Sequence, residues 1–217
     1  TADLGRVGER DQGKVERVQR WLVHILTQEE FPAVERVTAG DSLACLRRDG
    51  AGGDPRPGVG LRPDGLPDIA WRDVPAGPFV MGSPDDRLAF AGKETPQREV
   101  ELPAFRIGMY PVTNAQYAAF VGDGGYTEKW RKCWTNAGWD WKGDRDGPRT
   151  YGGVFDLPNH PVVMMSWYEA VAFCGWLTER LRAAGEMSSD EVVTLPSEPQ
   201  WEKAARGENG LLWPWGN

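Results

Sequence analysis

The residue types that most often carry out chemistry are few in this sequence and lie far apart. It contains three cysteines, Cys45, Cys133 and Cys174, and two histidines, His24 and His160. Their spacing matches no metal-ligand pattern. We interpret Cys174 as a small buried thiol, His24 as a partly buried residue of a helix and His160 as a loop residue bonded to the backbone. The sequence therefore predicts no catalytic residue and no metal ligand.

Four further polar residues have structural explanations that are simpler than catalysis. Ser166 and Ser197 each have Glu or Gln three residues later, which is the pattern of a helix N-cap and not of a hydrolase nucleophile. Glu198 and Glu202 lie four residues apart on one face of a short helix that also carries Lys203. Acidic and basic side chains at this spacing form solvated surface pairs. We expect no acid/base catalysis from them.

The segment from Tyr126 to Asn159 is the strongest candidate for a binding surface. It is longer than an ordinary loop and combines aromatic rings with basic residues. Trp, Tyr and Arg provide a large contact area at modest entropic cost, which is typical of binding hot spots. The alternative is that the rings only fasten a long loop to the domain. We predict that a protein or small-molecule ligand contacts Trp130, Trp134, Trp139, Trp141, Arg145 and Tyr151.

Composition limits the class of protein. Of the 217 residues, 40% are hydrophobic and 11 are Trp, which indicates a globular domain that can bury large rings. The net charge of -7 argues against a nucleic-acid partner. No run of about 18 apolar residues could cross a bilayer, and no signal peptide is visible. We predict a cytoplasmic protein without a membrane partner, although Thr1 is not a native start and leaves room for an upstream segment.

Before the main domain, the apolar spacing predicts two amphipathic helices, at about residues 14–26 and 32–48. Two such helices bury little alone, so they must pack on each other, on the following domain or on upstream helices of a helical-repeat region. Residues 49–68 are rich in Pro and Gly, which is typical of a linker. We therefore divide the chain into a helical segment at 1–48, a linker at 49–68 and a domain at 69–217.

The domain is predicted to be of the α+β class, with short sheets, flanking helices and long loops. Strands are expected at 69–74 and 75–82, joined by a tight turn, and at 98–102, 105–110 and 193–195. These strands are too short to form one large sheet.

Three helices of the domain are predicted to begin at the N-caps Thr113, Ser166 and Ser197. In the last two helices, apolar spacing places Trp167 and Trp201 on the stripe that faces the core. We expect both rings to be buried.

Four motifs occur in an order that resembles one known family. They are Gly77-Pro-Phe-Val-Met-Gly82; Tyr110-Pro-Val-Thr-Asn-Ala-Gln-Tyr117; Pro161-Val-Val-Met-Met-Ser-Trp-Tyr-Glu-Ala-Val-Ala-Phe-Cys-Gly-Trp176; and Leu195-Pro-Ser-Glu-Pro-Gln-Trp-Glu-Lys-Ala-Ala-Arg-Gly207, followed by Trp213-Pro-Trp-Gly-Asn217. From about Trp71 to Asn217 the sequence resembles the formylglycine-generating-enzyme (sulfatase-modifying factor) family. The resemblance implies a C-type-lectin-like fold.

The resemblance also bears on cofactors. The oxidases of this family bind copper through a cysteine pair that lies downstream of the Trp-Pro-Trp-Gly-Asn motif. The family's calcium-binding loop also lies downstream of this motif. Cys133 and Cys174 match neither cysteine position, so copper or calcium is expected only through a further C-terminal part. We accordingly expect the domain to be incomplete at Asn217 and its remainder to be a partner of this chain. The family's sulfoxide synthases use an iron site on N-terminal helices, which His24 and His160 do not reproduce.

The resemblance leaves several functions open. The leading hypothesis is a non-catalytic ligand-recognition module, as in multidomain bacterial regulators and in variable proteins of diversity-generating retroelements. The alternative is a copper-dependent oxidase that converts a sulfatase cysteine to formylglycine, with its catalytic part beyond Asn217. A third, weaker hypothesis is a purely structural interaction module. A cysteine pair downstream of Asn217 would favour the oxidase.

Overall fold

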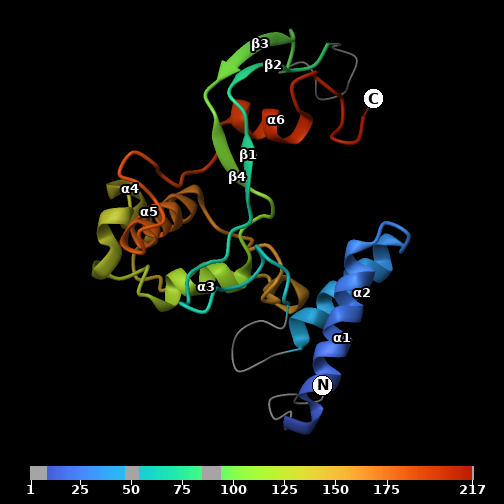
Figure 1. Cartoon of the computed structure of the whole chain (residues 1–217). Coiled ribbons are helices and arrows are strands. Elements are labelled where there is room, and N and C mark those ends of the chain that lie inside the picture. The colour runs from blue at the N-terminus through green and yellow to red at the C-terminus, as the bar shows by residue number, and fades with distance from the viewer. Residues whose placement is uncertain (1–8, 47–53, 85–93, 217) are drawn as a thin grey trace. The chain divides into compact units, whose positions relative to one another are not determined.

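The computed structural model describes residues 9–46, 54–84 and 94–216, and their elements are labelled in Figure 1. Two helices precede four consecutive short antiparallel strands, and further helices follow, so the α+β class expected from the sequence is confirmed.

The chain forms two compact units. Unit 1 consists of residues 1–70 and 110–194, and unit 2 of residues 71–109 and 195–217. Unit 1 contains the long helices, and unit 2 contains all four strands that the described residues form.

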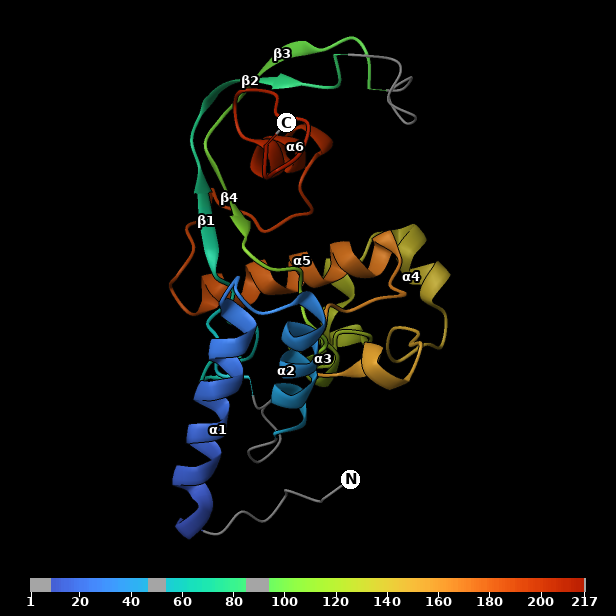
Figure 2. The same ribbon diagram turned by 90° about the vertical axis from the view of Figure 1, so that its right-hand side faces the viewer.

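The elements of unit 1 are helical. They are α1 (Glu9–Thr27), α2 (Ala33–Cys45), α3 (Asn114–Gly122), the 3-10 helix η2 (Glu128–Cys133), α4 (Asn136–Lys142), the 3-10 helix η3 (Gly153–Asp156) and α5 (Trp167–Ala183). Helices α1 and α2 pack side by side, as both views show (Figures 1 and 2). Both predicted N-terminal helices are therefore present.

The helix starts follow the pattern expected from the sequence. The side chains of Thr113 and Ser166 each accept a hydrogen bond from the backbone N–H three residues later, and Gln116 and Glu169 bond back to the backbone N–H of the cap. These reciprocal bonds satisfy amide groups that a helix start leaves without partners. Ser197 begins a third helix in the same way.

The core of unit 1 lies between α3 and α5 and is built largely from aromatic rings. Its buried members are Tyr117, Phe120, Tyr126, Trp134, Ala172, Phe173, Trp176, Leu177 and Leu181. The prediction that Trp167 belongs to this core is wrong, because its side chain is 60% exposed. Trp176 is buried instead. Nine residues of an α-helix turn about 900°, so the two rings point in opposite directions.

Part of the predicted linker packs into unit 1. Val59 and Leu66 are buried, at 4% and 5% exposure. The side chain of Gln116 on α3 donates to the backbone oxygens of Gly58 at 3.1 Å and Asp68 at 2.5 Å. Residues of this segment are therefore fastened to the start of α3.

The strands of unit 2 form one long hairpin. Strand β1 (Trp71–Val74) pairs with β4 (Phe105–Gly108), and β2 (Gly77–Met81) pairs with β3 (Arg98–Leu102). Val74 faces Phe105 and Gly77 faces Leu102, so one register continues across both ladders.

The expected tight turn between β1 and β2 is wrong, because these strands follow one another along the same arm of the hairpin. Pro75 and Pro103 interrupt the two arms at the same level. Proline lacks the amide donor that a ladder needs. The predicted strand at 193–195 is also wrong, since the Val193 amide bonds to the Thr178 side chain at 2.9 Å instead of to a strand.

Helix α6 (Glu198–Arg206) completes unit 2 and lies against β2 and β3. Its buried residue is Lys203, at 2% exposure, whose Nζ donates to the backbone oxygens of Pro75 at 2.8 Å and Gly77 at 2.9 Å. Trp201 is 62% exposed, so its prediction as a core residue is wrong. The side of α6 that faces the hairpin therefore carries Lys203. Its ammonium supplies hydrogen-bond donors where proline interrupts the ladder.

Glu202 is not the solvated surface charge that the sequence suggested. Its side chain is 16% exposed, accepts the Gly82 amide at 2.7 Å and pairs with Arg206 at 2.5 Å. Arg206 also donates to the Gly82 carbonyl at 3.0 Å. The pair thus holds the end of β2 on α6.

Candidate functional site

The segment from Tyr126 to Asn159 was the candidate binding surface, and the structure folds it into η2, α4 and η3. Its rings come to lie in different environments. Trp134 is only 4% exposed, and its indole N–H donates to the Gly125 carbonyl at 2.8 Å. Trp130 packs against the core and donates to the Asp123 carbonyl at 3.1 Å. These two rings fasten the segment, as the alternative interpretation expected.

The rings of α4 carry cations on their faces. The Lys142 ammonium lies 4.6 Å from the centroid of the Trp139 ring, and the Arg145 guanidinium lies 3.9 Å from that of Trp141. Lys142 is buried and donates to the backbone oxygens of Gly143 and Arg145, so it holds the turn after α4 in place. Cation–π contacts of this kind orient both partners.

A row of aromatic rings, with an exposed tryptophan at each end, continues from α4 onto α5. The Trp141 ring lies 5.8 Å from Tyr168, and Tyr168 lies 5.6 Å from Trp167. Trp141 and Trp167 are 40% and 60% exposed. We call Trp141, Tyr168, Trp167 and Arg145 the aromatic row. The sequence prediction found Trp141 and Arg145 but missed the two rings of α5, because it assigned Trp167 to the core.

Tyr151 is 65% exposed and contacts Phe155 at 5.4 Å. The six predicted ligand residues are therefore not brought together as one surface. Trp141 and Tyr151 are the exposed ones among them. Ligand binding by these residues stays a prediction.

A buried polar chain that the sequence analysis missed crosses the core of unit 1. The Tyr126 hydroxyl donates to Glu169 Oε1 at 2.7 Å and lies 2.9 Å from the Tyr117 hydroxyl. Glu169 Oε2 accepts the Ser166 amide and hydroxyl. Burial, together with the neighbouring tyrosine and carboxylate, raises the pKa of Tyr126 above its ordinary value. The phenol therefore stays protonated and serves as a fixed donor to Glu169.

The three cysteines lie in different environments. Burial raises the pKa of the Cys174 thiol to about 11 and also raises the pKa of Cys133. Both thiols therefore stay protonated near neutral pH, where they are weak nucleophiles. Cys133 packs its side chain against Gly175, and Cys45 is exposed at the end of α2. Across the ranges that the structure describes, no cluster of His, Cys, Asp and Glu could hold a metal ion.

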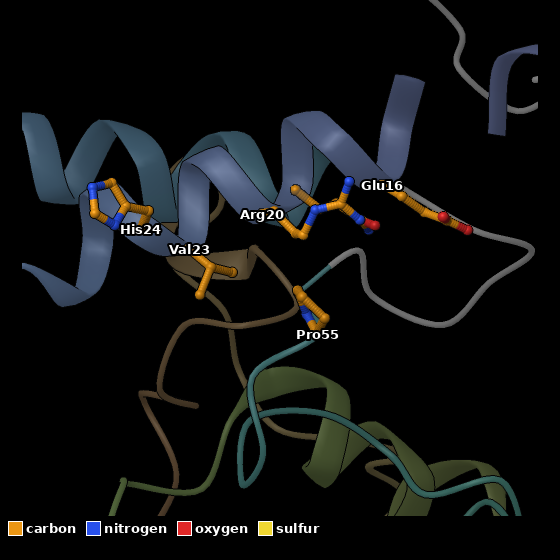
Figure 3. Close-up of a pocket in the computed structure, with 6 residues that line it drawn as sticks. Glu16, Arg20, Val23, His24 and Pro55 are labelled. Carbon is orange, nitrogen blue, oxygen red and sulfur yellow. The ribbon is translucent and has the colours of Figure 1, made fainter. Parts of the chain in front are cut away.

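The histidines differ from their predicted environments. His24 is exposed and contacts the rings of Trp21 and Phe31 edge-on, so it is not partly buried. It borders an open cavity of about 510 Å³ between α1 and Pro55, which Figure 3 shows with side chains from successive turns of α1. His160 bonds to the Asp41 side chain at 2.8 Å, not to the backbone through its ring.

Comparison with known proteins defines the family. Residues 70–217 match the model of the sulfatase-modifying factor enzyme 1-like domain. This match covers more than half of the chain, and the chain therefore belongs to that family, whose domain is C-type-lectin-like. The resemblance inferred from the four motifs is thus confirmed.

The curated relatives carry the names of oxidising enzymes. The hercynine oxygenase of Mycolicibacterium thermoresistibile is 36% identical over 76% of this chain and 38% of its own length. The formylglycine-generating enzyme of Thermomonospora curvata is 34% identical over 66% of this chain and 51% of its own. That of Bos taurus is 30% identical over 82% and 50%. The chain thus spans between about a third and a half of these relatives.

These relatives overturn the leading functional hypothesis. None of those named above is a recognition module or a variable protein, whereas the names point to oxidation. The hypothesis of a non-catalytic module was wrong because it rested on the lack of catalytic residues in this part of the chain. The findings favour the alternative. No helix in the described ranges is long and apolar enough to cross a membrane.

Proposed function

We propose that this chain is part of an oxidising enzyme of the sulfatase-modifying factor family. The observation that carries the proposal is its identity of 30–36% to relatives named as an oxygenase and as formylglycine-generating enzymes. Because the chain spans only 38–51% of those relatives, the activity is proposed for the whole protein that contains it.

Within this class, the first candidate is a copper-dependent oxidase that converts a sulfatase cysteine to formylglycine. The family match over residues 70–217 supports it. For this candidate, copper would be held by a cysteine pair downstream of the Trp-Pro-Trp-Gly-Asn motif, as the family resemblance implies. The second candidate is an oxygenase that acts on hercynine, which the 36% identity over 76% of the chain supports.

The test is a pair of assays on the whole protein. In one, a sulfatase-motif peptide is incubated with copper and oxygen, and formylglycine is detected by mass spectrometry. In the other, hercynine is supplied with iron(II), a thiol and oxygen, and its consumption is followed. The formylglycine-generating enzyme of Thermomonospora curvata serves as a positive control for the first assay. Oxygen-dependent product in one assay supports that candidate, and no product in either would overturn the proposal.

The aromatic row provides a second test of how this enzyme would meet its substrate. An exposed Trp141 beside Arg145 offers a ring face and guanidinium donors. If the row contacts the substrate, Trp141→Ala should raise KM with little change in kcat, whereas Phe155→Ala, also exposed, should change neither. Equal effects of both variants would remove the row from the substrate site.

We also place the protein in the cytoplasm. Its three cysteines are free thiols, as a reducing compartment favours.

A further inference from the structure

Helix α2 is joined to the rest of unit 1 by polar contacts from two consecutive residues. Asn159 Nδ2 donates to the Gly40 carbonyl at 2.9 Å and to Asp54 Oδ2 at 2.8 Å. His160 Nε2 lies 2.8 Å from Asp41 Oδ1. We call the side chains of Asn159, His160, Asp41 and Asp54, with the Gly40 carbonyl, the latch. It joins three segments of the chain, and Asn159 lies more than 100 residues after both Gly40 and Asp54.

The backbone beside the latch binds the start of α3. The amide of Asn114 donates to the His160 carbonyl at 2.9 Å, and that of Ala115 donates to the Pro158 carbonyl at 2.9 Å. The Asn114 side chain donates to the carbonyls of Phe155 and Leu157, at 2.7 Å and 2.9 Å. Residues 155–160 thus supply acceptors for donors that the first turn of a helix leaves unpaired. The same short segment touches α2 through its side chains and α3 through its backbone.

Little else ties the helical pair to the helices of the core. Extensive packing joins α1 to α2, and in the described ranges no comparable contact joins either helix to α3 or α5. The buried residues of α2 are Ala39, Gly40, Leu43 and Ala44. A Cβ added at Gly40 would lie 3.6 Å from Leu26 Cδ1, an ordinary van der Waals distance, so α1 and α2 are in contact at this position. The latch is thus a polar attachment of α2 to segments outside the helical pair.

One acceptor atom of the closed latch lacks a donor from the described part of the chain. Asn159 Oδ1 is shielded from solvent and has no hydrogen-bond partner among the residues that the structure describes. Turning the amide over would not help, since the oxygen would then face the Gly40 carbonyl and the Asp54 carboxylate. A buried acceptor without a donor loses its hydration and gains nothing in return. An opened latch would let water reach this oxygen, so closed and open states differ less in free energy than the number of bonds suggests.

Asp54 keeps the latch charged near neutral pH. Although burial opposes it, hydrogen bonds from Arg56 and Asn159 lower the pKa of Asp54. Arg56 donates to the Asp54 carboxylate through Nη2 at 2.7 Å and through Nε at 3.0 Å. The acceptor for Asn159 is thereby fixed in position from the side of residues 54–56.

We propose that the latch is a conformational coupling device, which holds the helical pair α1–α2 on unit 1 and transmits its release to residues 155–160 and the first turn of α3. When α2 moves away, Asn159 and His160 lose their side-chain partners. The backbone acceptors for Asn114 and Ala115 then lose their restraint. A load or a partner acting on the helical pair would in this way loosen a segment that belongs to the family domain.

The test is hydrogen–deuterium exchange on the full chain with Asp41→Ala. This variant removes one bond at a partly exposed position of α2 and leaves α3 untouched. Amides of α2 should exchange roughly tenfold faster, as the loss of one hydrogen bond allows. Under the proposal, the amides of Asn114 and Ala115 also exchange several-fold faster, although they lie on another helix. Amides of α5 should keep their protection.

A stronger variant, Asn159→Asp, places a carboxylate against Asp54 and should open the latch further, with the same pattern of exchange. Asp64→Asn is the matched control, because it weakens an exposed ion pair with Arg62 away from α2. Faster exchange confined to α2 in the Asp41→Ala protein would overturn the coupling. Unchanged exchange in α2 would overturn the latch altogether. If Asn159→Asp unfolds the protein, the Asp41→Ala result alone decides.

Discussion

Unit 1 and unit 2 bury different kinds of side chain. In unit 1, Phe120, Phe173 and Trp176 lie with their ring centroids 5.5–6.0 Å apart, and aromatic rings make up most of the hydrophobic core between α3 and α5. In unit 2, Phe79, Met81 and Lys203 are buried, and the Lys203 ammonium donates to the backbone oxygens of Pro75 and Gly77. Because proline interrupts the hairpin and leaves backbone carbonyls without ladder partners, this unit needs buried hydrogen-bond donors more than it needs buried apolar surface. The comparison teaches that one chain can stabilise two units by different means.

The largest effect should come from the ring core. Trp176→Ala removes a ring that is 1% exposed and leaves Asp123 without the indole donor at 2.8 Å. We expect the free energy of unfolding of unit 1 to fall by about 3–5 kcal/mol, as for other large aromatic truncations in cores. Denaturant unfolding followed by tryptophan fluorescence measures it. A loss below about 1 kcal/mol would show that the rings do not stabilise unit 1.

The next effect should appear in unit 2 alone. Lys203→Met keeps the length of the side chain but removes the donor to Pro75 and Gly77. Two carbonyl oxygens lose their partner, and we expect a cost of about 1–3 kcal/mol. Hydrogen exchange should then accelerate in β2, β3 and α6, while α5 stays protected.

Lys132→Met is the control for this substitution, because Lys132 is 62% exposed and pairs with Glu179 on the surface. A surface pair contributes little, so exchange should hardly change. If the two variants behave alike, the buried ammonium has no special role in unit 2.

A smaller effect concerns the pH dependence of the core of unit 1. Burial raises the pKa of Cys174 from 9.0 to about 11, so the folded state holds this proton more tightly than the unfolded state. Its contribution to stability is complete below pH 9 and is lost as the pH rises from about 9 to about 11. Cys174→Ala should flatten the stability profile over this range. In alkylation at pH 8, exposed Cys45 should react first and Cys174 last.

The smallest effect is expected for Trp201→Ala. This residue of α6 is 62% exposed, so replacing its ring should change the free energy of unfolding by about 0.5 kcal/mol or less. Trp201→Ala and Trp176→Ala form a matched pair, since each removes a helical tryptophan that belongs to one of the four family motifs. A cost as large as that of Trp176→Ala would mean that Trp201 is covered in the protein in solution.

Much of the fold could be predicted because the relevant interactions are local. The caps Thr113, Ser166 and Ser197 depend on a residue three positions away, and all three were predicted correctly. The strand at 98–102 was placed at its observed bounds. Less of the candidate site could be predicted. Within one aromatic segment, Trp134 became core and Trp141 surface, and nothing in their spacing distinguishes the two.

The sequence by itself determined the family, the α+β class and the start of each capped helix, because short-range hydrogen bonds and motif order are written in consecutive residues. Only the tertiary structure decided which tryptophan of α5 is buried. It also decided that Lys203 donates to the Pro75 carbonyl, and that His160 bonds to Asp41. These pairs are separated by more than 100 residues in the last two cases. Side chains brought together by chain folding satisfy one another's hydrogen bonds, and no local pattern encodes such partners.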